Sequence, residues 1–130
     1  MYRFYLTEEN LLKAEQFPMV ALINEAANSD IIEFVENLVN GVGSGYNYSN
    51  CSFWDDLDEY DQANTSQFEG LWVSNEGGEE VIVSINDVSY YLETLYSRLT
   101  NEKYDKLYEL RKLLDAFKVA YCNKAQGERL

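Results

Sequence analysis

Histidine is absent from this sequence of 130 residues, and cysteine occurs only twice, as Cys51 and Cys122. Without histidine, the Ser-His-Asp and Cys-His catalytic arrangements cannot form, and the usual general base near neutral pH is missing. The two cysteines lie far apart and lack the Cys-x-x-Cys spacing of zinc sites. We therefore expect a protein that is not an enzyme, with no catalytic residues, no metal site and no cofactor.

Basic residues are also scarce, because Lys and Arg together number 10 against 23 for Asp and Glu, which gives a net charge of −13. The acidic excess belongs to residues 1–97, whose net charge is −16, whereas residues 98–130 carry +3. Such a charge repels nucleic acid and anionic membranes, and its self-repulsion destabilises the folded state. It either supplies solubility or forms a field directed at a basic partner.

Long apolar runs and flexible linkers are missing as well. The longest apolar run, residues 19–23, is far shorter than the roughly 20 residues of a membrane span. The start Met1-Tyr2-Arg3 lacks the apolar region of a signal peptide. With 46% hydrophobic residues, one proline and seven glycines, the composition is that of a globular protein. We expect one domain over residues 1–130, in the cytoplasm.

Helical signals occur at both ends of the chain. Thr7 is a candidate N-cap, and Pro18 suits the first turn of a second helix. Residues 30–40 form an amphipathic pattern with Asp30 as N-cap and Gly41 as C-terminal signal. Two further helices are predicted at the C-terminal end of the chain. The first has Asn86 or Asp87 as N-cap, and its apolar positions are Val88, Tyr91, Leu92, Leu95 and Leu99. The second follows Asn101, and its apolar positions are Leu107, Leu110, Leu114, Phe117 and Tyr121. The last series spans about two heptads, too few for a coiled coil.

Strand signals occupy the middle of the chain, at residues 46–54, 70–74 and 80–85. Residues 75–78, Asn-Glu-Gly-Gly, suit a hairpin connection between the second and third of these segments. Alternation predicts Leu71 and Val73 on the core face and Trp72 on the opposite face. We predict an α+β fold, with a small three-stranded antiparallel sheet packed with N-terminal and C-terminal helices.

The most concentrated signal is residues 53–61, where five acids in seven residues are flanked by Trp54 and Tyr60. Its position between two predicted strands makes it a loop. It is either a binding loop, with aromatic residues beside charge as in interface hot spots, or a solvated acidic connection. An EF-hand beginning at Asp56 is excluded, because Asp61 stands where glycine is needed and Gln67 where glutamate is needed. The tyrosines, such as Tyr46 and Tyr48, fit either a core edge or an aromatic binding surface.

Several short motifs carry a resemblance to a known family. They are Asn40-Gly41-x-Gly43-x-Gly45, Cys51-Ser52-Phe53-Trp54-Asp55-Asp56-Leu57, Phe68-Glu69-Gly70, and Gly78-Glu79-Glu80-Val81-Ile82-Val83-Ser84 leading into Tyr90-Tyr91-Leu92-Glu93. With these motifs, residues 30–100 resemble the ribonuclease-toxin immunity proteins of bacterial contact-dependent growth inhibition systems. The resemblance implies a small cytoplasmic antitoxin that binds the C-terminal toxin domain of a large surface-delivered protein and blocks its nuclease site.

Charge gives this interpretation a mechanism, since a ribonuclease cleft is lined with Lys and Arg and an acidic surface can occupy it in place of phosphates. We expect the partner to be a basic ribonuclease toxin domain, bound as a 1:1 heterodimer by an otherwise monomeric protein. The expected toxin-binding residues are Trp54, Asp55, Asp56, Asp58, Glu59, Tyr60, Asp61, Glu69, Trp72, Glu79 and Glu80. The alternatives are an acidic DNA mimic, a generic protein-interaction module without a toxin partner, and an enzyme that uses carboxylates.

Overall fold

A four-stranded antiparallel sheet and five α-helices make up residues 2–123, the part of the chain that the computed structural model describes. The strands lie in the order β1-β2-β3-β4, which is also their order along the chain. Their bounds are β1 Ser44–Gly45, β2 Ser49–Ser52, β3 Leu71–Asn75 and β4 Glu80–Val83. The helices are α1 Phe17–Ala27, α2 Ile31–Val39, α3 Glu59–Ala63, α4 Ile85–Asn101 and α5 Leu107–Phe117. The α+β class predicted from the sequence is confirmed.

Shorter helical turns complete the chain. Three are 3-10 turns, η1 Glu8–Asn10, η2 Ala14–Gln16 and η3 Trp54–Asp56, and a π-helical segment, η4 Lys118–Asn123, continues α5. Thr7 caps η1 as predicted, because its hydroxyl accepts from the Glu9 N–H while Asn10 accepts from the Thr7 N–H. The first helix is thus only a single 3-10 turn.

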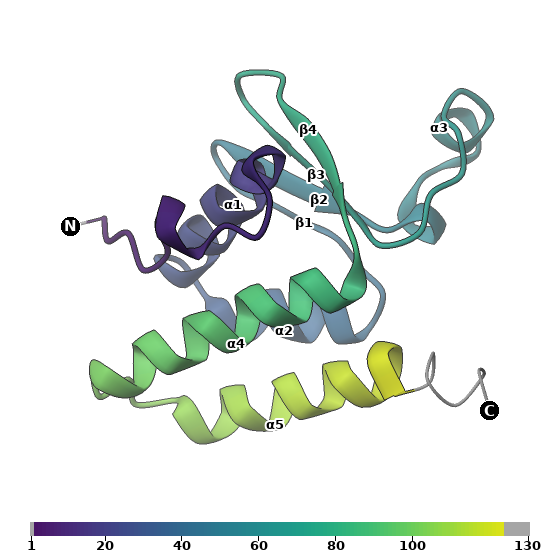
Figure 1. Cartoon of the computed structure of the whole chain (residues 1–130). Coiled ribbons are helices and arrows are strands. Elements are labelled where there is room, and N and C mark those ends of the chain that lie inside the picture. The colour runs from purple at the N-terminus through teal and green to yellow at the C-terminus, as the bar shows by residue number, and fades with distance from the viewer. Residues whose placement is uncertain (1, 124–130) are drawn as a thin grey trace.

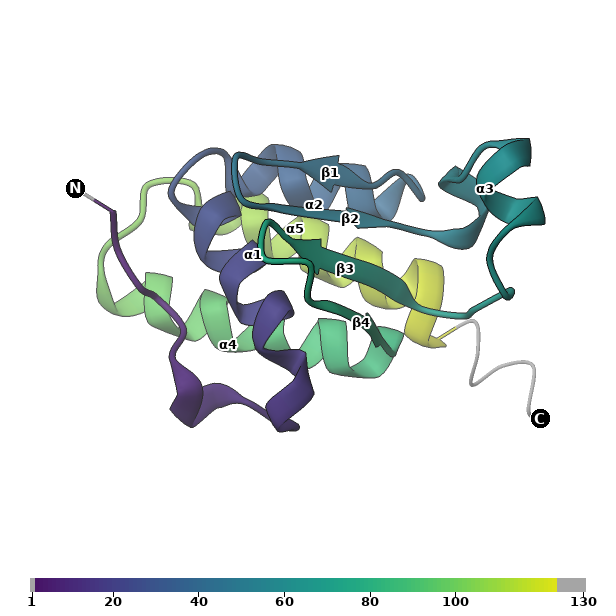
Figure 2. The ribbon, with the colours of Figure 1, turned by 90° about the horizontal axis from the view of Figure 1, so that it is seen from above.

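One face of the sheet packs on helices, and the other face does not. Helix α1 contacts β2, β3 and β4, and α5 packs along α2 and α4. In Figure 1 the sheet lies above α2, α4 and α5, and Figure 2 shows the strands in front of α2 and α5. Leu71 and Val73 on β3 are buried against the helices, while Trp72 between them points to the outer face. This alternation agrees with the sequence prediction.

The core lies between the sheet and the helices. Its largest fully buried side chains come from the N-terminal segment, from α1, α2, α4 and α5, and from β3: Tyr91, Phe34, Phe117, Leu6, Met19, Leu22, Ile23, Leu38, Leu71, Leu92, Leu95 and Leu110. The apolar stripes predicted for the C-terminal helices are therefore core-facing, with Leu107 and Tyr121 packed at the edge of the core. Burial of these two stripes against α1, α2 and each other provides much of the hydrophobic driving force for folding.

Polar contacts fasten the N-terminal segment to this core. The Tyr91 hydroxyl donates to Gln16 Oε1 at 2.6 Å and accepts from the Leu12 N–H at 3.0 Å. The buried Asn24 amide bonds both the N–H and the carbonyl of Leu6, each at 3.0 Å. These bonds satisfy backbone groups that enter the core without regular secondary structure.

Three details of the prediction are wrong. The sheet has four strands and not three, because residues 44–45, which lie before the first predicted strand, pair with Asn50 and Cys51. The close approach needs glycine at position 43, where a Cβ would lie 2.1 Å from the Cys51 carbonyl oxygen. The strand predicted over residues 46–54 is shortened to β2, Ser49–Ser52. A turn precedes β2, in which the Tyr46 N–H donates to the Ser49 carbonyl at 2.8 Å.

The third correction concerns the start of α4. Ile85, predicted to share a strand face with Val81 and Val83, is the first residue of the helix. Its N-cap is Ser84, whose hydroxyl accepts from the Asp87 N–H at 3.2 Å, and not Asn86 or Asp87. Serine has an extended backbone here and a short side chain that reaches back to the helix, which is why it ends the strand and caps the helix at once.

Candidate functional site

The acidic residues predicted to bind a partner lie on the connection between β2 and β3, residues 53–70, which we call the acidic segment. In Figure 1 it projects to the right of the sheet and carries α3 at its end. The sequence predicts a loop here, and the structure instead contains η3 and α3. Asp58 begins α3, because its carboxylate accepts from the Asp61 N–H at 2.8 Å. Short helical turns give the acids a defined arrangement.

All five acids of residues 55–61 are exposed, but they divide into two groups. Asp56 accepts from the Gly43 N–H at 2.8 Å, and Asp58 is the cap of α3, so both also hold the local structure. The side chains of Asp55, Glu59 and Asp61 make no hydrogen bond or ion pair within residues 2–123. These three carboxylates are the ones available to a partner without a structural cost.

Aromatic side chains attach the acidic segment to the outer face of the sheet. The ring of Phe68 packs edge-on against Trp54 and against Trp72, with centroid separations of 5.7 Å and 5.8 Å. Phe68 is buried, and the two tryptophans are half-buried. Tyr60, by contrast, is 73% exposed. Among the predicted aromatic anchors, Tyr60 is free of the fold, while Trp54 and Trp72 belong to this cluster and present only part of their surface.

Beside the cluster, the outer face of the sheet contains a hollow of about 350 Å³. It is lined by Thr65, Ser66, Phe68, Trp72, Glu80, Val81 and Ile82. Trp72 and Ile82 are directly paired across β3 and β4, and Ile82 is 51% exposed. An apolar hollow bordered by polar residues, here Glu80, Thr65 and Ser66, is the kind of surface in which an interface anchor is buried. We call it the outer-face hollow.

The predicted site residues are therefore brought together only in part. Glu80 and Trp72 meet at the outer-face hollow, and Glu69 is exposed next to Phe68 in the chain. Glu79 lies in the β3–β4 turn, where it accepts from the Asn75 side-chain amide at 3.3 Å, and it does not line the hollow. The sequence reasoning missed Thr65, Ser66 and Ile82. For Ile82 a signal existed, because it alternates with Val81 and Val83 and so shares the face of Trp72.

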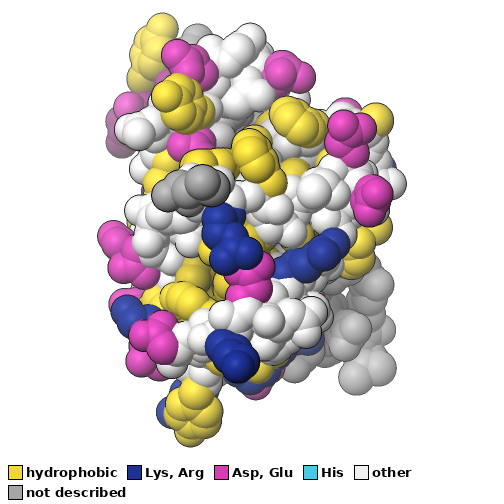
Figure 3. All heavy atoms as spheres, turned by 90° about the vertical axis from the view of Figure 1, so that its left-hand side faces the viewer, with side chains coloured by type: hydrophobic (Ala, Val, Ile, Leu, Met, Phe, Trp, Pro, Cys, Tyr) yellow, Lys and Arg dark blue, Asp and Glu magenta, His cyan; other side chains and the backbone are white. Residues whose placement is uncertain are grey.

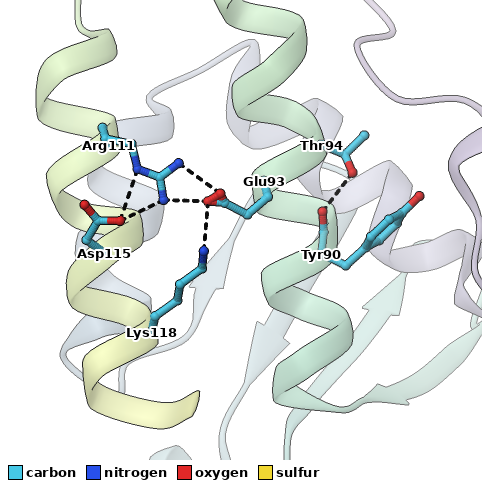
Figure 4. A network of polar contacts seen from close by, with 6 residues as sticks. All are labelled: Tyr90, Glu93, Thr94, Arg111, Asp115 and Lys118. Carbon is cyan, nitrogen blue, oxygen red and sulfur yellow. Dashed lines mark hydrogen bonds and ion pairs between the residues drawn. The ribbon is translucent and has the colours of Figure 1, made fainter. Parts of the chain in front are cut away.

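Within residues 2–123, no base forms an ion pair with a carboxylate of the acidic segment. The ion pairs within residues 2–123 join Arg111 to Glu93 and Asp115, Lys118 to Glu93, and Arg3 to Glu102. Figure 4 shows the ion pairs of Arg111 and Lys118, which link α5 and its continuation to Glu93 on α4. The Arg111 guanidinium donates hydrogen bonds to both Glu93 and Asp115. On the side of the molecule shown in Figure 3, where the N-terminal segment and the α4–α5 turn lie, Lys and Arg gather in the lower half beside acids. The bases of these described ion pairs all have partners outside the acidic segment.

Three other features were considered for residues 2–123, namely metal ligands, the Cys51 thiol and membrane-spanning helices. No group of three or more Cys, Asp or Glu side chains in residues 2–123 is placed to hold a metal ion. Burial raises the pKa of the Cys51 thiol to about 11, with the nearby charge of Asp56 adding to the shift, so this thiol is a poor nucleophile. No helix within the described range has the length and apolar character needed to cross a membrane.

Comparisons with protein-family models, with curated proteins and with solved structures find no match to this chain. A function is therefore inferred from the acidic segment and the outer-face hollow themselves.

Proposed function

We propose that the chain is an immunity protein that binds a basic ribonuclease toxin domain of a contact-dependent growth inhibition system and covers its active-site cleft. The single observation that carries this proposal is the acidic segment, where residues 55–61 bear five exposed carboxylates beside an apolar hollow, and none of the ion pairs within residues 2–123 involves them. In the proposal the protein performs no chemistry of its own and acts in the cytoplasm, where the toxin would attack RNA.

Charge supports this proposal over a purely solubilising role. Solubility requires only that charge be spread over the surface, whereas five acids on one projecting segment produce a local field that acts on a partner. A nuclease cleft lined with Lys and Arg is complementary to that field. Complementary fields raise association rates toward about 10⁸–10⁹ M⁻¹ s⁻¹, and fast capture matters when one toxin molecule cleaves many RNAs.

The arrangement of the site adds a second argument. Tyr60 is 73% exposed beside the free carboxylates of Glu59 and Asp61, and the outer-face hollow lies at the base of the same segment. Interfaces bury an aromatic or aliphatic anchor at their centre and surround it with polar contacts. In our proposal the acidic segment enters the cleft, and an apolar side chain of the toxin occupies the hollow between Trp72 and Ile82.

The experiment that tests this proposal is a titration of the protein against the toxin domain encoded beside it. RNA cleavage and complex formation are followed at about 50 mM and 500 mM salt, a range over which screening of exposed charges changes strongly. The proposal predicts stoichiometric inhibition and an association rate that falls as salt rises. No complex at either salt concentration would refute it. A tight complex whose association rate does not respond to salt would refute the electrostatic mechanism.

A further inference from the structure

Two buried oxygen atoms have no hydrogen-bond partner in the described part of the chain, Glu25 Oε1 and Ser49 Oγ. The residues that carry them line the same hollow, of about 240 Å³. Its other walls come from Tyr2, Ala21, Tyr48 and the β3–β4 turn at Asn75, Glu76 and Gly77. Buried polar atoms are normally bonded, so two unpartnered oxygens in one hollow indicate a missing donor.

The hollow is built from the fold rather than from a mobile surface. Glu25 lies on α1, and its Oε2 accepts from the Tyr48 N–H at 3.2 Å, which fixes the carboxylate. Ser49 is 2% exposed and pairs with Asn75 at the end of β2. A second hollow, of about 400 Å³, is also lined by Tyr2, Glu25 and Tyr48, so the carboxylate stands between two recesses. We call this arrangement the Glu25 site.

The chemistry of the unpartnered atoms selects the ligand. A carboxylate oxygen only accepts hydrogen bonds, whereas a serine hydroxyl both donates and accepts, so the carboxylate is the atom that requires a donor from a ligand and the hydroxyl can accept from one as well. A positively charged donor gains most, because it also compensates the buried negative charge. The pKa of Tyr2 is raised, by burial first and then by the charge of Glu25, which shows that the field of this carboxylate reaches the ring at the wall.

Aromatic walls and the small number of ligands favour an organic cation over a metal ion. Tyr2 and Tyr48 line the hollow, and aromatic rings attract ammonium and guanidinium groups at close range. Calcium takes six to eight oxygen ligands, whereas the two unpartnered oxygens here are one carboxylate oxygen and one hydroxyl. Tyr2 and Tyr48 are 46% and 61% exposed, so their side chains are free to move aside and admit a ligand to the buried oxygens.

We propose that the Glu25 site binds an organic cation, a guanidinium or ammonium group, carried by an arginine or lysine side chain or by a free small molecule. The site is separate from the acidic segment: that segment joins β2 after Ser52, whereas Ser49 lies at the opposite end of the strand. The proposal is therefore independent of the toxin and is tested without it.

Nuclear magnetic resonance titration of the isotope-labelled full chain is the test. Methylguanidinium and methylammonium are added as probes, and sodium chloride at equal ionic strength is the control for unspecific charge effects. Saturable shifts at the amides of Tyr48 and Ser49, with a dissociation constant of about 1–10 mM as expected for so small a ligand, support the site. Shifts that rise linearly, or that sodium reproduces, overturn it.

A peptide probe separates the two sources of the cation. If acetyl-arginine-amide binds more tightly than methylguanidinium, the site suits the side chain of a protein partner. If the affinities are equal, it suits a free cation.

Variants make the assignment specific. Glu25→Gln removes the charge with little change of shape and should weaken binding at least about tenfold. Glu36→Gln removes one charge from an exposed position on α2 that lines neither recess and should leave the affinity unchanged. Tyr48→Ala keeps the carboxylate, removes one aromatic wall and should weaken binding about two- to fivefold, so it decides the matter if Glu25→Gln does not fold. Equal affinity in Glu25→Gln and Glu36→Gln would refute the proposal.

Discussion

The neighbouring residues Asp55 and Asp56 allow the structural and binding roles of the acidic segment to be separated. Both are exposed, and alanine at either position removes one negative charge from the same place. Only Asp56 has a partner in the fold, the Gly43 N–H at 2.8 Å. We therefore expect Asp56→Ala to destabilise the protein and Asp55→Ala to leave its stability unchanged.

The size of the effect follows from that one contact. A hydrogen bond to a charged group contributes about 1.5–3 kcal/mol, and exposure of the carboxylate to solvent reduces this. We expect Asp56→Ala to lower the free energy of unfolding by about 1 kcal/mol, and Asp55→Ala to change it by less than about 0.5 kcal/mol. For a domain of this size, 1 kcal/mol corresponds to a decrease of about 3–5 °C in the unfolding temperature.

Urea denaturation followed by tryptophan fluorescence measures both values, since Trp54 lies in the acidic segment and Trp72 contacts the segment through Phe68. The Gly43 amide should also exchange its hydrogen faster in Asp56→Ala than in Asp55→Ala. Equal stability of the two variants would show that the contact between Asp56 and Gly43 does not hold the segment in place, and the reasoning that assigns Asp56 a structural role would fail.

Three further predictions concern the rest of the fold. Tyr91→Phe leaves the Leu12 N–H and Gln16 Oε1 without their partner and should lower the free energy of unfolding by about 2–3 kcal/mol. The control is Tyr108→Phe, because the Tyr108 side chain is 74% exposed and its change should leave the free energy of unfolding almost unaltered in the same denaturation assay. Equal losses of stability in the two variants would contradict the account. Hydrogen bonding from Arg111 lowers the pKa of Glu93 from its usual 4.5, so ionised Glu93 stabilises the fold above that pH and the contribution disappears as pH falls through the lowered value. Glu93→Gln should therefore reduce stability at pH 7 and flatten its decline in acid, and an unchanged pH profile would argue against the ion pair. Iodoacetamide at pH 8 should label half-exposed Cys122 well before Cys51, because Cys51 is 3% exposed and burial raises its pKa to about 11. Mass spectrometry of the native protein measures the two labelling rates, and equal rates would refute the burial of Cys51.

Helix periodicity was the most informative part of the sequence. The positions Val88, Tyr91, Leu92, Leu95 and Leu99 are all buried on α4, and Asp30 and Gly41 bound α2 as predicted. Such predictions succeed because spacing and caps are local properties of the chain. The capping of α4 by Ser84 was missed, since β4 and α4 meet with no intervening loop and the strand pattern continues into Ile85.

Non-local contacts account for what the sequence did not predict. Strand β1 has only two residues and exists because it pairs with β2, so no local signal distinguishes it from a turn. The position of Glu79 away from Trp72 depends on the geometry of the β3–β4 turn. In the Glu25 site, the residues Tyr2, Glu25 and Tyr48 are separated by more than twenty positions each along the chain, and only packing brings them together.

The measurement that tests the central claim most directly is the association rate of two triple variants with the toxin domain. One variant replaces the free acids of the segment, Asp55→Asn, Glu59→Gln and Asp61→Asn, and leaves the structural acids Asp56 and Asp58 in place. The matched control, Glu9→Gln, Glu36→Gln and Glu109→Gln, removes the same charge from exposed positions outside the acidic segment.

At low salt, the account predicts that the segment variant associates roughly tenfold more slowly than the control. It also predicts that the segment variant loses inhibition of RNA cleavage at toxin concentrations that the control still neutralises. Equal association rates and equal inhibition by the two variants would contradict the account.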